Sequence, residues 1–161
     1  MRAESLRTLK AELQADVEVL LKLKSKWELI NSKLEKIQPD EFDFAALGYS
    51  MANLYTLMEN YFLRIAKAFE NELGPSSWHR DLVRRMSLEI EGIRPALLNT
   101  SDVPLIDELR AFRYVFRHIY QTELDREKIS MVNRRIPEAL KRFRSAHDRF
   151  IEDLEHIISE I

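Results

Sequence analysis

The densest group of chemically capable side chains lies between Leu109 and Tyr120. Arg113 is followed after four residues by His118 and then, after one more, by Tyr120. A histidine that titrates near neutral pH can take a proton from a ribose 2′-hydroxyl. An arginine guanidinium can hold a phosphate through its charge-rich transition state. This pair needs no metal ion and no cofactor, so the stretch is a candidate site for phosphate-ester chemistry.

Helical geometry predicts where these side chains point. At about 100° per residue, the apolar residues of the stretch form one stripe about 80° wide, which is the expected buried face. That stripe consists of Leu105, Leu109, Phe112, Phe116 and Ile119. Arg113, Arg117 and Tyr120 lie on one flank of it, whereas His118 points about 140° away on the other side. His118 is therefore expected to be exposed. On geometry alone, such a histidine and a tyrosine with its hydroxyl in water are also ordinary surface features.

The elements that must position this stretch are long helices, because apolar residues recur every three or four positions along the chain. Of 161 residues, 45% are hydrophobic, and only three glycines and five prolines interrupt the pattern. We expect Gly48 to bend the second helix and Pro137 to kink or break the last one. The expected helices span 3–36, 42–73, 78–98, 104–124 and 125–161. We predict a single all-α domain over residues 1–161, built as an up-and-down bundle of four to five long helices.

Composition excludes several classes of site. The chain has no cysteine, which rules out disulfides, thiolate zinc sites and cysteine nucleophiles and suits a reducing cytoplasm. No apolar run approaches the roughly 20 residues that a membrane-spanning helix needs, and the amphipathic N-terminus has no signal core. Three scattered glycines cannot build a phosphate-binding loop. A di-iron bundle needs Glu-x-x-His pairs, and the sequence contains none.

The charge distribution is uneven. Residues 110–149 hold 11 basic and 5 acidic side chains, whereas the rest of the chain holds 14 basic and 22 acidic ones. A basic segment on an acidic remainder is expected where one face meets a polyanion such as RNA. Long helices with solvated charges produce the same pattern, so both interpretations stand.

Arg113, His118 and Tyr120 together resemble the Arg-x4-His-x-Tyr motif of the HEPN superfamily, in particular that of the HepT-like ribonuclease toxins. Those proteins are helical bundles of about this length with the motif late in the chain, on the fourth helix. A Leu124-Asp125 pair after the motif and an Ile136-Pro137 pair in the last helix fit the same order of elements.

The resemblance implies a cytoplasmic, metal-independent endoribonuclease that cleaves RNA, tRNA being one candidate. Arg113 would hold the scissile phosphate and His118 would act as general base or acid, with the 2′-hydroxyl attacking to leave a cyclic 2′,3′-phosphate. Two subunits of a homodimer would form each cleft, and Arg110, Tyr114 and Arg117 are candidates for RNA contacts. The resemblance also implies a nucleotidyltransferase antitoxin of the MNT type, which would place AMP on Tyr120.

One position departs from the family pattern. The residue after the motif arginine is usually small and polar, often Asn, and here it is Tyr114. This difference favours an alternative, a non-catalytic HEPN-like module that binds RNA, a nucleotide or a protein. A helical adaptor in which the motif is coincidental is a third interpretation. Candidates for lining the same cleft from the second helix are Tyr49, Asn53, Asn60 and Arg64.

Overall fold

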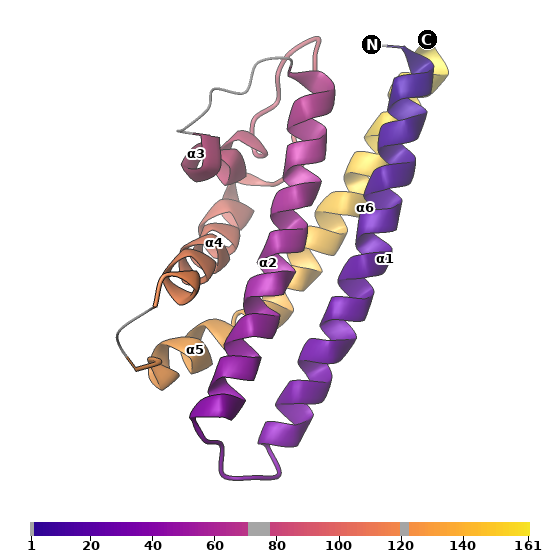
Figure 1. The fold of residues 1–161 in the computed structure, drawn as a ribbon. Helices are drawn as coiled ribbons and strands as arrows, with labels where there is room; N and C mark the ends of the chain where they lie inside the picture. The colour runs from indigo at the N-terminus through magenta and orange to yellow at the C-terminus, as the bar shows by residue number, and fades with distance from the viewer. Residues whose placement is uncertain (1, 71–77, 120–122) are drawn as a thin grey trace.

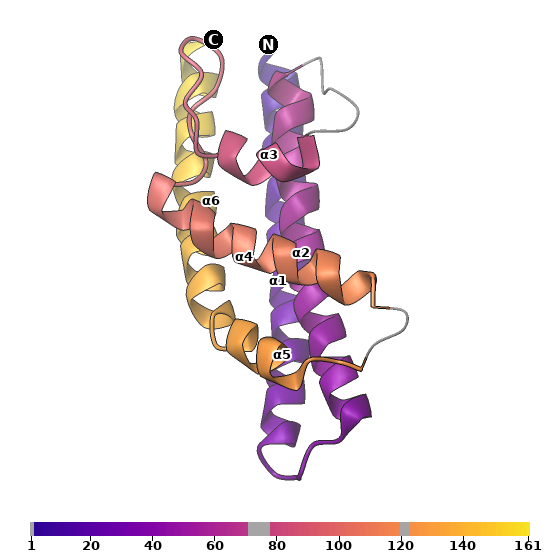
Figure 2. The same ribbon diagram turned by 90° about the vertical axis from the view of Figure 1, so that its left-hand side faces the viewer.

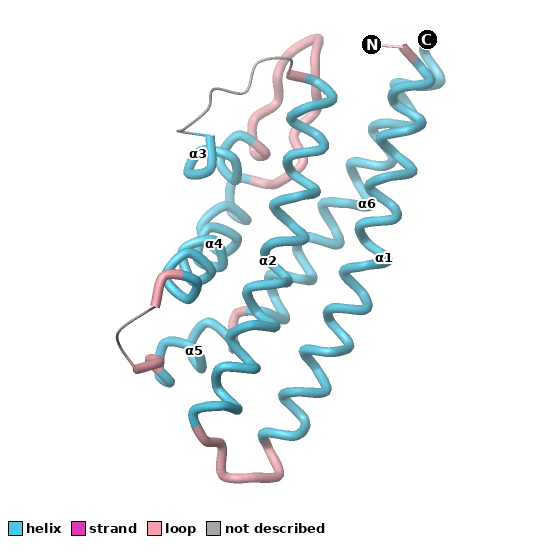
Figure 3. Tube along the Cα trace, viewed as in Figure 1, coloured by secondary structure: helices cyan, strands magenta, loops and turns pink. Residues whose placement is uncertain are grey.

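The computed structural model describes residues 2–70, 78–119 and 123–161. Its elements are α1 (Ala3–Leu34), α2 (Glu41–Phe69), α3 (Trp78–Arg85), the 3-10 turn η1 (Thr100–Asp102), α4 (Val103–Arg117), α5 (Arg126–Asn133) and α6 (Ile136–Glu160). Every regular element in these ranges is helical (Figure 3), so the prediction of an all-α bundle is confirmed. None of the described helices is long and apolar enough to cross a membrane.

The long helices of the bundle lie along one axis, and the shorter helices form a layer that crosses them. The helices α1 and α2 run antiparallel and are joined by a short turn, with α6 alongside them (Figure 1). The shorter helices α3, α4 and α5 lie across this group instead of along it (Figure 2). The up-and-down description therefore holds for α1 and α2, whereas α6 runs parallel to α2 and α4, which carries the motif, crosses α2.

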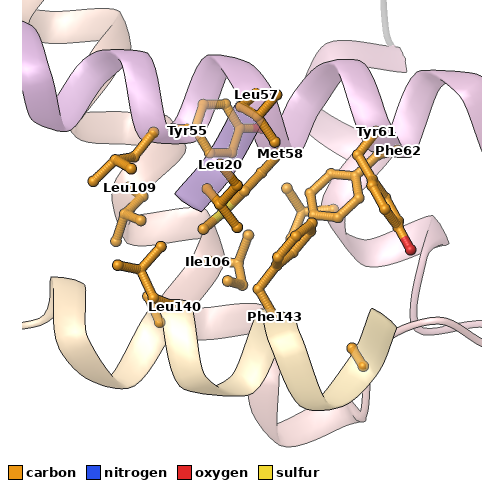
Figure 4. Close-up of a cluster of buried hydrophobic side chains, with 14 of the residues drawn as sticks. Leu20, Tyr55, Leu57, Met58, Tyr61, Phe62, Ile106, Leu109, Leu140 and Phe143 are labelled. Atoms are coloured by element: carbon orange, nitrogen blue, oxygen red, sulfur yellow. The ribbon is translucent and has the colours of Figure 1, made fainter. Parts of the chain in front are cut away.

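The apolar side of α4 packs into the core that the long helices form. Tyr61 and Phe62 of α2 pack against Phe143 of α6 (Figure 4), with ring centroids 4.9 and 6.0 Å from that of Phe143. Ile106 and Leu109 of α4 join the same cluster and are at most 1% exposed. Burying such side chains stabilises the fold by roughly 1.5–3 kcal/mol each, which fixes α4 on the bundle.

Local signals explain several helix boundaries. Asp40 caps α2, since its carboxylate accepts from the backbone N–H of Asp43, and Asp125 caps α5 in the same way. Pro137 lies in the first turn of α6, where its missing N–H costs nothing. The expected last helix is accordingly broken into α5 and α6, with the break just before Pro137.

The first four expected helices all end earlier in the structure, the third and the fourth by the most. The third ends at Arg85 instead of residue 98, because the buried side chain of Arg94 folds back and donates to the Arg85 carbonyl at 3.0 Å. Gly92, in the left-handed region with φ of 72°, reverses the chain between them. The fourth ends at Arg117 instead of residue 124, where the His118 N–H donates to the carbonyl of Val115 at 3.1 Å and tightens the final turn.

Candidate functional site

The end of α4 is docked on the beginning of α2 by a close aromatic contact. Phe112 and Phe116 stack with their ring centroids 5.7 Å apart, and the Phe116 ring lies against Gly48 of α2. A Cβ at Gly48 would stand 2.9 Å from Phe116 Cζ and closer still to Cε2. Only glycine admits this approach, so Gly48 has a packing role beside the motif.

Arg113 is held by α2. Its Nη1 and Nη2 donate to the two carboxylate oxygens of Glu59 at 3.1 and 2.6 Å, which makes a bidentate ion pair. The two side chains are only 12% and 11% exposed. The guanidinium carbon lies 4.6 Å from the ring centroid of Tyr55, a fully buried residue of α2 labelled in Figure 4. Charge pairing and cation–π contact together fix the plane of this arginine.

Arg117 meets the same part of α2. Its Nη2 donates to Thr56 Oγ1 at 2.9 Å, and Arg113 Nη1 lies 3.4 Å from that same oxygen. The prediction that Arg113 and Arg117 share one flank of the helix is thereby confirmed. Arg110 instead pairs with Asp107 one turn earlier on α4, at 2.5 Å. That hydrogen bond to Asp107 raises the pKa of Arg110 above its ordinary value.

His118 is exposed, as helical geometry predicts, and follows the last residue of α4. Its Nδ1 lies 2.6 Å from the carbonyl oxygen of Tyr114, and its ring lies over the Tyr114 ring with centroids 4.3 Å apart and planes 30° apart. A carbonyl can only accept, so Nδ1 carries the proton and Nε2 is the ring nitrogen that can take one up in the neutral form. Tyr114 itself is 62% exposed.

Sequence reasoning missed the α2 side of this site. Glu59 and Thr56 were not among the candidates, although an acidic residue at a core position of an amphipathic helix demands a partner. Among the α2 candidates, Arg64 points to α1, where it pairs with Asp16 at 2.8 Å. It does not join the motif. Tyr49 is 62% exposed on α2, and Tyr120 lies outside the described residues.

The described ranges 2–70, 78–119 and 123–161 contain no group of three or more His, Asp or Glu side chains arranged to hold a metal ion. What the fold and site define is a helical-bundle protein with an arginine–histidine pair at the end of a crossing helix. Residues 46–154 match a family model described as HepT-like protein, so the chain belongs to the HepT-like family of the HEPN superfamily. The match begins in α2 and ends in α6, and α1 lies outside it. A comparison with curated proteins gives no match, and neither does one with solved structures.

Proposed function

We propose that this protein is a metal-independent endoribonuclease toxin that cleaves RNA by attack of a 2′-hydroxyl on the adjacent phosphate. Membership of the HepT-like family implies the ribonuclease class. The observation that carries the chemistry is the setting of His118. It is exposed, and its Nδ1–H is bonded to the Tyr114 carbonyl, which makes Nε2 the ring nitrogen that would transfer a proton.

The proposed reaction balances without a co-reactant. Nε2 of His118 takes the proton from the 2′-hydroxyl, and the 2′-oxygen forms a bond to phosphorus as the bond to the 5′-oxygen breaks. The leaving 5′-oxygen gains a proton from a histidine in its imidazolium form. The products are a 2′,3′-cyclic phosphate and a 5′-hydroxyl. The Nδ1–H bond to Tyr114 holds the ring in one tautomer and orientation during the transfer.

Arginines on the other flank of α4 would hold the phosphate. Arg113 is the proposed phosphate ligand of the motif, and Arg117, which is exposed and anchored on Thr56, would contact the neighbouring backbone. The exposed ring of Tyr114 would stack with a base. Arg110, already paired with Asp107, would contribute positive charge at longer range.

We propose that a homodimer completes the cleft. Tyr114 and Val115 are 62% and 57% exposed on the outer face of α4, and large apolar side chains clustered beside a site are typical of an interface. Next to them is an apolar cavity of about 160 Å³, bordered by Val115 and by Ile129 of α5. A second copy of the motif would bring another His118 toward the phosphate and cover this surface.

Regulation by a nucleotidyltransferase antitoxin of the MNT type is part of the same proposal, since HepT-like proteins typically pair with one. Addition of AMP to Tyr120, two residues after His118, would introduce a bulky anion beside the cleft and repel RNA.

A second candidate function is a non-catalytic module that binds RNA, a nucleotide or a protein. The observation that favours it is the pairing of Arg113 with Glu59, which neutralises the charge that the motif would offer to a phosphate. Tyr114, at the usually small and polar position, favours it as well.

An RNA cleavage assay in EDTA separates the two candidates. Purified wild type should cleave RNA, with total tRNA among the substrates, to products with cyclic-phosphate ends. His118→Ala should lose cleavage and keep its helical circular dichroism spectrum. The matched control is His156→Ala, which removes another exposed histidine at the far end of α6 and should cleave like wild type. RNA binding without cleavage by a dimeric wild type would favour the non-catalytic module.

A further inference from the structure

Glu59 is the acidic side chain of α2 that meets the motif, and its setting is costly. Its carboxylate is 11% exposed, and an ionised carboxylate at such a position destabilises a fold unless it is paired and hydrogen-bonded. Both carboxylate oxygens are used by Arg113, at 3.1 and 2.6 Å. The pair joins α2 to the crossing helix α4 within one chain.

Three side chains of α2 contact the Arg113 guanidinium. Tyr55 lies under its plane with its ring centroid at 4.6 Å, Glu59 takes the Nη1/Nη2 fork, and Thr56 Oγ1 lies 3.4 Å from Nη1. A guanidinium has a second fork, formed by Nε–H and the outer hydrogen of Nη2, which can hold two phosphate oxygens. With the first fork fixed on Glu59, the direction of the second is fixed too.

We propose that Glu59 is the positioning residue of Arg113, orienting its second fork for the scissile phosphate, an inference that rests on the proposed ribonuclease function. Glu59 does not touch RNA in this proposal. It preorganises the arginine, so that less ordering is needed in the transition state. It also cancels the charge of Arg113, so the approach of RNA depends more on Arg117, which is anchored on neutral Thr56.

These two effects predict that one substitution lowers both kcat and KM. Glu59→Gln keeps the size of the side chain but removes its charge, so RNA should bind more tightly while the arginine is less well oriented. We expect KM to fall and kcat to fall about 10- to 100-fold, the range that a small misplacement of a catalytic group produces. Glu59→Asp keeps the charge and withdraws the carboxylate by one methylene. It should lower kcat and leave KM unchanged.

The matched control is Asp16→Asn. Asp16 is also a buried carboxylate that pairs with an arginine of α2, Arg64, at 2.8 Å, but on the α1 side. This variant should lose a similar amount of thermal stability and keep kcat and KM. A double-mutant cycle repeats Glu59→Gln in an Arg113→Lys background. There Glu59→Gln should cause no further loss of kcat, because the guanidinium that Glu59 positions is absent.

The proposal is tested by the steady-state cleavage of one RNA oligonucleotide that wild type cuts. The Tm of each variant is measured in parallel. A fall of both kcat and KM in Glu59→Gln, with no additional loss of kcat in the Arg113→Lys background, supports the proposal. A lower Tm with unchanged kcat in both Glu59 variants would overturn it and leave the pair a structural one. A wild type that cuts no RNA would refute the proposed function and this inference together, whereas an active wild type matched by both Glu59 variants would refute the inference alone.

Discussion

Replacing Gly48 by alanine tests whether the docking of α4 on α2 rests on the contact with Phe116. The new Cβ would stand 2.9 Å from Phe116 Cζ and closer to Cε2, well inside van der Waals contact. Overpacking of this kind costs about 1–3 kcal/mol. Replacing glycine by alanine inside a helix returns about 0.5–1 kcal/mol. The single variant should therefore lose between about 0 and 2.5 kcal/mol, a range too wide to be diagnostic by itself.

A double-mutant cycle isolates the contact. Phe116→Ala removes Cδ2, Cε2 and Cζ, the three atoms that the new Cβ would meet. In that background Gly48→Ala should stabilise the protein through helix propensity, which gives a coupling of about 1–3 kcal/mol. Urea unfolding followed by circular dichroism measures each variant, and 1 kcal/mol corresponds to about 2–4 °C in Tm at this size. Effects that add to within about 0.5 kcal/mol would refute the assigned role of Gly48.

Two further predictions concern acid stability and subunit architecture. Burial lowers the pKa of His147, whose Nδ1 lies 2.8 Å from the Tyr61 hydroxyl, so the unfolded chain binds this proton more tightly. Stability should then fall as pH drops below about 6.5. His147→Gln should flatten that dependence and His156→Ala should not, as pH-dependent urea midpoints would reveal. Mixing inactive Arg113→Ala and His118→Ala subunits should restore about a quarter of the wild-type cleavage if each cleft takes its arginine and histidine from different chains. No recovery after verified subunit exchange would contradict a composite cleft.

The beginnings of helices could be predicted from sequence more readily than their ends. Asp40 and Asp125 act as caps through contacts three residues away, and Pro137 acts on its own turn, so each signal is local. The end of α3 depends instead on Arg94, which reaches back nine residues to the carbonyl of Arg85. No periodicity encodes that contact, because a chain reversal at Gly92 must first bring the two residues together.

The same distinction applies to the candidate site. Angles around one helix predicted that His118 is exposed and that Arg113 and Arg117 share a flank, because both facts depend on α4 alone. The contact of Glu59 with Arg113 depends on how α4 crosses α2, which is a property of the tertiary structure. Its position was still a usable signal: it lies four residues after Tyr55 and three before Phe62, both fully buried, so an opposite charge had to reach it.

The basic excess of residues 110–149 has a third explanation besides an RNA-facing surface or solvated helices. Arg113 pairs with Glu59, and Arg142 reaches Asp102 at 3.3 Å, so acidic groups elsewhere in the chain neutralise part of it. Arg135 lies 3.9 Å from Glu108 in a third such pair. The uneven charge distribution thus partly reflects pairing between elements. The charge available to RNA near the motif is smaller than the sequence count implies.

Arg113 and His118 point in different directions from α4, and this affects how a cleft can form. Five residues along a regular helix separate two side chains by about 140°. In the structure Arg113 is bound on the α2 side, whereas His118 bonds the Tyr114 carbonyl of its own helix. Cleavage requires the phosphate-holding fork and the proton-transferring nitrogen to reach the same few ångströms of RNA. A phosphate held by the Arg113 of one chain is met most directly by the His118 of a second chain packed against α4. For this reason the mixed-subunit experiment, more than either single substitution, tests the proposed architecture of the cleft.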